Sequence, residues 1–230
     1  MTALFSERFS VFTGCYGSGK TELSIAIARH VRKKKTGRVA LVDLDIVNPY
    51  FRSAEKEALL LSEGIEVFMP SFAMSTVDIP ALPAQIMAVF EQPFSHVVID
   101  VGGHDTGAAA LGRYAPHIAR VRHELRAYGV VNACRPFSDT PQGVAEMFEL
   151  IATRGRVRPD ALVNNTNLQG QTTAQLVAEG YALTAEAARL MGVPVAFSSG
   201  TPATQAQLPP DVPYFAFEPV MLPEFLGGKP

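Results

Sequence analysis

The chain has few cysteines, no excess of charge and no long hydrophobic run, and each scarcity argues against a class of protein. Its two cysteines, Cys15 and Cys134, lie far apart and lack the spacing of metal ligands, so a reduced setting is the simplest expectation. The formal net charge of −2 gives no electrostatic reason to expect a nucleic-acid partner. No apolar stretch approaches membrane-spanning length, and residues 1–10 lack the apolar core of a secretory signal. We therefore expect a cytoplasmic protein without a membrane-spanning segment.

The sequence does contain enough apolar residues for a sizeable core. It has 230 residues, of which 47% are hydrophobic and 18% are charged, as in ordinary globular proteins. This length fits one large domain. We expect that domain to span residues 1–207, with the proline- and phenylalanine-rich tail of residues 208–230 lying extended on it or on a partner.

One stretch near the amino terminus carries a specific chemical signal. It fits the pattern of glycine, four residues, glycine, lysine and then serine or threonine, and it consists of Gly14, Cys15, Tyr16, Gly17, Ser18, Gly19, Lys20 and Thr21. A short alternating strand over residues 9–13 precedes it, and apolar residues at helical spacing over residues 21–34 follow it. Strand, glycine loop and helix form the context in which such a stretch binds phosphate. The alternative is an ordinary glycine-rich turn with an exposed lysine.

The residue types in this stretch suit a polyphosphate. Glycines adopt backbone angles that other residues avoid, and they let phosphate approach the main chain. Successive N–H groups then form an anion site at the start of a helix. Lys20 would reach the β- and γ-phosphates, and the hydroxyl of Thr21 would bind Mg²⁺.

Two further segments place acids just beyond apolar strands. Residues 38–43 predict a buried strand that leads into Asp43 and Asp45, and residues 95–100 predict another that ends in Asp100, followed by Gly102 and Gly103. Carboxylates at such positions need a positive partner, such as Mg²⁺ or Lys20. Asp100 would hold the metal, and an amide at Gly102 or Gly103 would touch the γ-phosphate. For one acid of the first pair, capping a turn is an equally simple role.

Strands and helices alternate along the rest of the chain. Further strands are predicted at residues 65–68, 128–133, 160–163 and 193–197, and helices at residues 80–91, 106–124 with a break at Pro116, 143–153 and 172–191. The pattern predicts an α/β fold of three layers, in which helices cover both faces of a mostly parallel sheet. Its ligand is expected at the carboxyl edge. There Asn164 either hydrogen-bonds a nucleobase or forms a local turn.

With these residues together, roughly residues 8–200 resemble the P-loop superfamily that contains MinD, ParA, the nitrogenase iron protein and the GTPases UreG and HypB. The segment around Asp43 and Asp45 is similar to the MinD and ParA segment whose second aspartate positions the attacking water. The resemblance therefore implies a catalytic role for Asp45 beside Lys20, and a supporting role for Asp43. Asp100 and the glycines after it occupy the place of the second switch segment.

The chain also differs from these relatives at two places. Cys15 stands where MinD and ParA have a lysine that reaches the partner's nucleotide in a dimer. The ending Gly-Ser-Gly-Lys-Thr resembles UreG and HypB instead, but their base motif Asn-Lys-x-Asp corresponds to residues 164–167, which contain no aspartate. An amide pairs less well with guanine than a carboxylate does. The resemblance thus implies ATP, with Asn164 at the base.

The expected function is that of a MinD/ParA-like switch that binds Mg·ATP and hydrolyses it slowly, with a protein partner or a second copy. Three alternatives stay open. The first is a metal-insertion GTPase like UreG or HypB. The second is an ATP-dependent carboxylate synthetase like dethiobiotin synthase or the cobyrinic-acid amidases. The third is a binding module that does not hydrolyse nucleotide and uses its tail as a partner surface.

Overall fold

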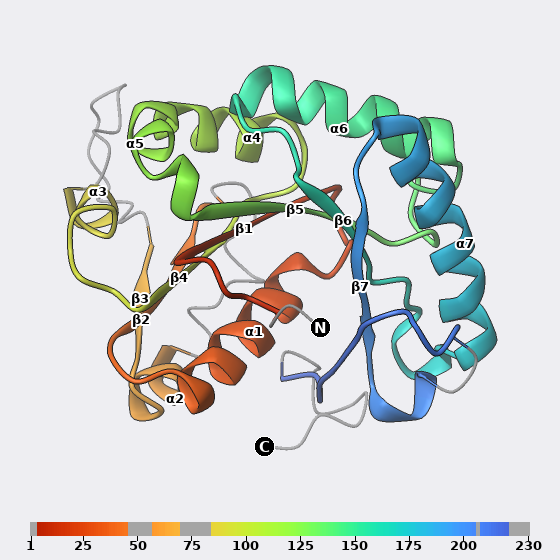
Figure 1. The fold of residues 1–230 in the computed structure, drawn as a ribbon, viewed down its shortest axis with the longest axis horizontal. Coiled ribbons are helices and arrows are strands. Elements are labelled where there is room, and N and C mark those ends of the chain that lie inside the picture. The colour runs from red at the N-terminus through yellow and green to blue at the C-terminus, as the bar shows by residue number, and fades with distance from the viewer. Residues whose placement is uncertain (1–3, 46–56, 70–83, 206–207, 221–230) are drawn as a thin grey trace, which may run out of the picture.

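The chain folds around one parallel sheet (Figure 1). This computed structural model describes residues 4–45, 57–69, 84–205 and 208–220, except for the side chains of residues 84, 104 and 105. Within these ranges eight strands pair in the order β3-β2-β4-β1-β5-β6-β7-β8, and every pairing is parallel. The strands are β1 (Phe9–Thr13), β2 (Val39–Asp43), β3 (Ile65–Phe68), β4 (His96–Asp100), β5 (Leu125–Val131), β6 (Ala161–Asn164), β7 (Val195–Gly200) and β8 (Tyr214–Ala216).

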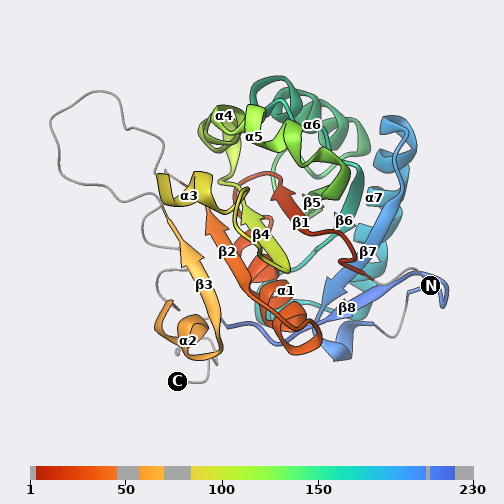
Figure 2. The same ribbon diagram turned by 60° about the vertical axis from the view of Figure 1, so that its left-hand side comes forward.

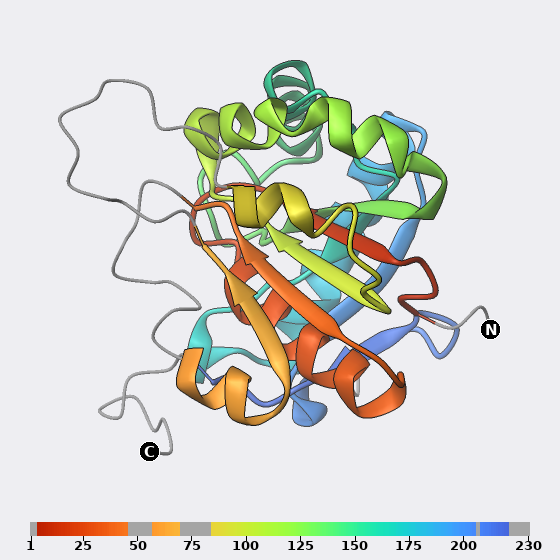
Figure 3. The same ribbon diagram turned by 90° about the vertical axis from the view of Figure 1, so that its left-hand side faces the viewer.

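Helices cover both faces of this sheet, which confirms the predicted three-layer α/β fold. Helix α1 packs against one face, and helices α4 to α6 lie over the other (Figures 1 and 3). The helices are α1 (Lys20–Lys34), α2 (Glu57–Ser62), α3 (Ala84–Ala88), α4 (His104–Arg113), α5 (Ala115–Arg120), α6 (Pro141–Gly155) and α7 (Ala174–Met191), with 3-10 turns at η2 (Arg122–Glu124), η3 (Gln169–Gln171) and η4 (Pro202–Thr204). None of the helices in the described ranges is long and apolar enough to cross a membrane.

The buried strands explain why the sequence shows apolar runs rather than strict alternation. In β1, Phe9 and Val11 belong to the core under α3 to α5, whereas Phe12 belongs to the core under α1. The ring of Phe12 stacks on that of Tyr128 in β5, with centroids 5.1 Å apart. Because both faces are covered, neighbouring residues on one strand are buried alike.

Several predicted boundaries differ by a few residues from the observed ones. The helix expected over residues 106–124 breaks at Tyr114 rather than at Pro116, which lies in the first turn of α5. Proline is well suited to that position because its missing N–H would have no partner there. Strand β5 begins at Leu125, earlier than the predicted residue 128. Residues 80–83, with which the helix expected over residues 80–91 begins, lie outside the described residues.

Part of the tail joins the sheet, which the sequence pattern did not predict. Residues 214–216 form β8, and they pair with β7 at one edge of the sheet (Figure 2). Phe215 is buried, and its ring lies 5.6 Å from that of Phe5 and 6.1 Å from that of Phe197. Farther on, the backbone N–H of Val220 donates to the carboxylate of Glu22 in α1. The described part of the tail is therefore packed on the domain.

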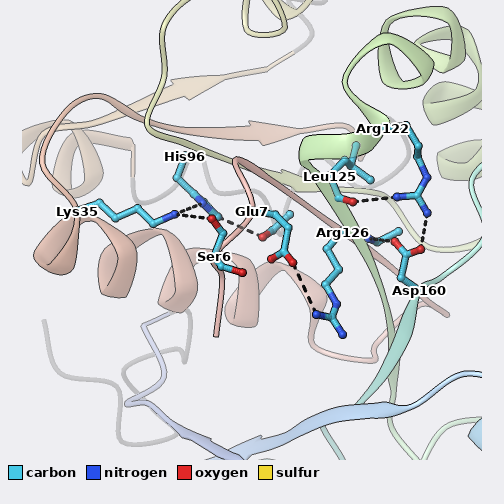
Figure 4. A network of polar contacts seen from close by, with 10 residues as sticks. Ser6, Glu7, Lys35, His96, Arg122, Leu125, Arg126 and Asp160 are labelled. Carbon is cyan, nitrogen blue, oxygen red and sulfur yellow. Dashed lines mark hydrogen bonds and ion pairs between the residues drawn. The ribbon is translucent and has the colours of Figure 1, made fainter. Parts of the chain in front are cut away.

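A buried histidine lies at the amino edge of the sheet, away from the predicted site (Figure 4). The Nε2 atom of His96 lies 3.1 Å from the hydroxyl of Ser10, and its Nδ1 atom lies 3.3 Å from the ammonium of Lys35. Burial and the charge of Lys35 lower the pKa of His96 to about 3, although a hydrogen bond with the backbone of Glu7 opposes the shift. The ring is therefore neutral in the folded protein at pH 7.

This neutral histidine predicts acid sensitivity. In the unfolded chain His96 takes up a proton near its ordinary pKa of 6.5, but in the folded chain only near pH 3, so acid favours the unfolded chain. We expect the free energy of unfolding to fall by about 2–3 kcal/mol more in the parent than in His96→Gln between pH 7 and pH 4. Urea unfolding at both pH values measures this. The control is His123→Gln, at a side chain that is 74% exposed, and equal losses in the parent and His96→Gln would contradict the prediction.

Candidate functional site

Residues 14–21, which we call the phosphate loop after their predicted ligand, run from the end of β1 into the first turn of α1 and have the backbone that their glycines permit. Gly14, Gly17 and Gly19 have φ values of 152°, 74° and 82°. A side chain at Gly14 would also collide with the carbonyl oxygen of Val130, since a Cβ there would lie 2.4 Å away. Gly19 begins α1 without any side-chain cap on the first N–H groups of the helix. Those groups are therefore suited to an anionic ligand.

Lys20 is folded back over this loop. Its ammonium donates to the carbonyl oxygen of Cys15 at 2.7 Å and lies 3.5 Å from the hydroxyl of Ser18. The residue is only 6% exposed, and burial lowers the pKa of its amine, while the nearby carboxylate of Asp100 opposes that shift. The Lys20 ammonium thus lies inside the loop, where phosphate oxygens could replace the carbonyl and hydroxyl oxygens as its hydrogen-bond acceptors.

The strand order brings the predicted acids to the same place. Strand β4 lies between β2 and β1, so Asp43 pairs in register with Asp100, which also pairs with Phe12 just before the phosphate loop. The N–H of Leu44 donates to the carbonyl of Asp100 at 2.8 Å, and the N–H of Asp45 donates to the carboxylate of Asp43 at 2.8 Å. Acids separated by more than 50 residues in the sequence therefore share one edge of the sheet.

The carboxyl group of Asp100 has the features of a cation ligand. It is 2% exposed, and its Oδ1 atom has no hydrogen-bond partner among the described residues. Burial, with a smaller contribution from Asp43, raises the pKa of Asp100 to about 7, although Lys20 and a hydrogen bond with Thr21 oppose the shift. A buried carboxylate beside other acids gains most from an added positive charge.

These residues fit Mg²⁺ better than a metal that needs a protein cage. The described residues contain no group of three or more His, Cys, Asp or Glu side chains that could hold a metal ion. Magnesium in nucleotide sites uses one or two protein oxygens and takes its other ligands from phosphates and water. Asp100 and Thr21, which contact each other, match that smaller requirement.

The two glycines after Asp100 allow the adjoining loops to touch. A Cβ atom on Gly102 would lie 2.8 Å from the carboxylate of Asp45, and one on Gly103 would lie 2.6 Å from the backbone nitrogen of Tyr16. The turn that starts α4 therefore packs directly on the phosphate loop and on Asp45. Any side chain at either glycine would separate these parts.

Asn164 occupies a different place from the one that the sequence suggested. Asn164 is fully buried, and its amide nitrogen donates to the carbonyl of Val177 at 3.0 Å and to the hydroxyl of Ser198 at 3.1 Å. Its amide oxygen accepts from the N–H of Thr166 at 3.2 Å. These internal bonds use the groups that a base would need. The side-chain amide of Asn164 thus connects β6 to α7 and β7.

Asn165 is the site residue that the sequence reasoning missed. Its amide nitrogen donates to the carbonyl oxygen of Ser18 at 2.8 Å, and its amide oxygen accepts from Ser199 at 2.9 Å. A Cβ atom on Gly19 would lie 2.4 Å from the same nitrogen, so only glycine allows this approach. Adjacent strand residues point to opposite sides, so the pair of asparagines left open which of them would turn toward the loop.

The loop after β5 forms another wall of the site. Arg135 donates from Nε to the carbonyl oxygen of Gly17 at 3.0 Å, and the hydroxyl of Ser138 lies 3.2 Å from the sulfur of Cys15. Cys15 is buried, so its side chain points into the domain. The position that holds a lysine in MinD and ParA is therefore used here for an internal contact.

Solved structures with this fold include nucleotide-bound proteins. The chain is 15% identical to FlhF complexed with GTP and Mg²⁺, with a TM-score of 0.53 over 86% of this chain and 68% of that one. It is 20% identical to the 54 kDa signal recognition particle protein from Aeropyrum pernix K1 in complex with GDP, with a TM-score of 0.55 over 89% of this chain and 43% of that one. It is 19% identical to FtsY from Thermotoga maritima, with a TM-score of 0.52 over 86% of this chain and 63% of that one. The chain thus spans less than two thirds of the last two proteins.

These likenesses establish the α/β fold of P-loop NTPases. Sequence comparison adds nothing further, because no protein-family model and no curated protein matches the chain. All three structural relatives are at most 20% identical, so they carry the fold alone. The narrower resemblance to MinD and ParA, the preference for ATP and the site residues stay predictions.

Proposed function

We propose that this chain binds a nucleoside triphosphate with Mg²⁺ at the carboxyl edge of its sheet, hydrolyses it slowly and acts as a molecular switch. The observation that carries the proposal is the phosphate loop with Lys20 folded over it, next to the buried carboxylate of Asp100. Glycine backbone angles, an uncapped helix start and two adjoining loops support it. The structural relatives that were solved in complex with GTP or GDP support the ligand class.

Each residue has a distinct role in this proposal. The backbone amides of residues 15–19 and the ammonium of Lys20 bind the phosphates and stabilise charge on them. Thr21 and Asp100 hold Mg²⁺, which when bound offsets charge on the β- and γ-phosphates. Asp45 orients the attacking water, and the amide of Gly103 contacts the γ-phosphate.

The base preference depends on the amides after β6. No carboxylate is present in residues 164–167 to accept from guanine, so we propose ATP as the preferred nucleotide. Asn165 holds the phosphate loop, Asn164 is enclosed, and the half-buried Asn167 donates its amide nitrogen to the carbonyl of Asn165 at 2.7 Å. Two of the structural relatives were solved in complex with guanine nucleotides, so a GTPase is the second candidate.

Calorimetric titration tests this function directly. The full chain is titrated with ATP and with GTP, each with Mg²⁺ and with EDTA. We expect Mg²⁺-dependent binding with ATP bound more tightly than GTP. Tighter binding of GTP would select the second candidate. Absence of binding for both nucleotides would contradict the proposed site.

Replacement of Asp45 separates binding from turnover. Asp45→Ala is expected to keep the nucleotide affinity within about threefold and to lower the hydrolysis rate by about 100-fold, because general acid–base groups contribute on that scale. Phosphate release under saturating nucleotide measures the rate. Asp211→Ala, at an exposed aspartate in the tail, is the matched control. Unchanged turnover in Asp45→Ala would assign the water to another residue.

A protein partner fits the surface around the site. Tyr16, Phe137 and Leu168 are 54%, 69% and 42% exposed, and they lie on the phosphate loop and on the loops that follow β5 and β6. Large apolar side chains exposed on loops at one edge of the sheet are features that a second protein can cover. We propose that a second copy or another protein binds there.

A further inference from the structure

A hollow of about 420 Å³ lies at the opposite edge of the sheet from the phosphate loop. It is lined by apolar residues of α5, by Arg122, and by residues 156–160, which include Arg156, Arg158 and one acid, Asp160. Arg122 precedes β5, and residues 156–160 lead into β6, so the hollow belongs to the amino ends of these parallel strands. The phosphate loop is at the carboxyl ends, at least roughly 15 Å away.

The segments around this hollow carry an excess of positive charge. Residues 113–126 and 154–160 contain seven arginines and no lysine, with only Glu124 and Asp160 as acids. The whole chain has a formal net charge of −2, so the other segments are clearly acidic. Arginine, unlike lysine, offers a planar fork that binds phosphate or carboxylate through two hydrogen bonds.

Two of the lining arginines form ion pairs that a bound anion could replace. Arg122 forms an ion pair with Asp160 and donates to the carbonyl of Leu125 at 2.9 Å (Figure 4). Arg158 lies 2.7 Å from the carboxylate of Glu149, and both of these side chains are about 60% exposed. Exposed pairs of this kind contribute little to stability, so a ligand can compete for their guanidinium groups at small cost.

Arg156 is the unusual member of the set. Among the described residues its side chain has no ion pair or hydrogen bond, and the residue is exposed. Its backbone has a φ of 55°, because it ends α6 in the left-handed conformation that glycine usually provides. An arginine at such a position strains the backbone by about 1 kcal/mol. The fold thus keeps a cation beside the hollow where glycine would be better for stability.

We propose that this hollow binds a small organic anion, with its phosphate or carboxylate group on Arg156 and the neighbouring arginines and its apolar part against Ile118 and Ala119. The volume is that of a small-molecule site. The charge selects an anion, and the apolar lining from α5 selects a compact ligand over an extended polymer. This site is separate from the nucleotide site and does not depend on it.

Titration of inorganic phosphate and of citrate tests the proposal and distinguishes the two anion chemistries. The parent, Arg156→Gly and the matched control Arg189→Gln are compared at low ionic strength, where surface charges are least screened. Arg189 is an exposed arginine paired with Glu186 on α7. We expect Arg156→Gly to weaken the binding of at least one anion tenfold or more, and Arg189→Gln to leave it unchanged. Arg156→Gly should also unfold at a temperature no lower than that of the parent.

Two further measurements locate the anion. Lys20→Ala removes the phosphate-loop cation, and the proposal expects it to retain binding of the same anion. Loss of binding in Lys20→Ala but not in Arg156→Gly would place the anion in the phosphate loop and overturn the proposal. Equal affinity in the parent and Arg156→Gly would overturn it as well. The second measurement titrates the parent with an oligoglutamate peptide and with a short single-stranded RNA, and binding of only one of these polymers, without binding of phosphate or citrate, would also overturn the proposal.

Discussion

Lys20→Ala is expected to weaken the binding of Mg·ATP by at least about 100-fold, which places it below detection in an ordinary titration. The ammonium of Lys20 is buried, and it is held by the carbonyl of Cys15 at 2.7 Å, in the concave side of the phosphate loop. Alanine cannot replace its charge-assisted hydrogen bonds to phosphate oxygens. Calorimetry with the parent and the variant measures the difference.

A second lysine on the same helix provides the control for this variant. Lys34→Ala removes one exposed cation from the last turn of α1 and should leave nucleotide affinity unchanged. Thermal unfolding of both variants separates loss of the ligand contact from loss of the fold. If Lys20→Ala binds nucleotide as tightly as the parent, the phosphate loop is not the nucleotide site.

Asp100→Asn is expected to change stability and ligand binding in opposite directions. In the absence of nucleotide and Mg²⁺, the variant should unfold with a free energy about 1–3 kcal/mol higher than the parent at pH 8. Burial raises the pKa of Asp100 to about 7, so the folded protein carries its charge at pH 8 at a cost that asparagine removes. With nucleotide present, the same variant should lose the Mg²⁺ dependence of binding.

Denaturant unfolding at pH 8 and titrations of nucleotide with and without Mg²⁺ measure the two effects. Asp211→Asn changes an exposed aspartate in the same way and should alter neither quantity. A variant that is both less stable than the parent and equally dependent on Mg²⁺ would show that Asp100 serves the structure rather than a metal.

The sequence predicted the phosphate loop and the α/β architecture because both depend on local patterns. Glycine spacing within residues 14–21 is visible without any tertiary information, and runs such as residues 39–43 are apolar because helices cover both faces. The convergence of Asp43, Asp45 and Asp100 could be expected only in outline. It depends on β4 lying between β2 and β1, which no local pattern reveals.

Other features needed the tertiary structure. Asn165 contacts Ser18, whereas Asn164 is enclosed, and only the orientation of β6 decides between these adjacent residues. Strand β8 is three residues long in a proline-rich tail, so its pairing with β7 is set by the burial of Phe215 rather than by strand propensity. The arginine hollow combines segments more than 30 residues apart in the sequence.

Helix α4 runs from the phosphate loop to the carboxyl end of α6 and packs closely at both of its ends. At its start, Gly103 leaves no room for a side chain beside Tyr16, and near its end a Cβ on Gly112 would lie 2.5 Å from the carbonyl of Arg154. Ten residues of helix span roughly 15 Å. Because both ends of α4 are packed this closely, we expect a shift of the turn at Gly103 to displace the carboxyl end of α6 as well, next to its C-cap residue Arg156.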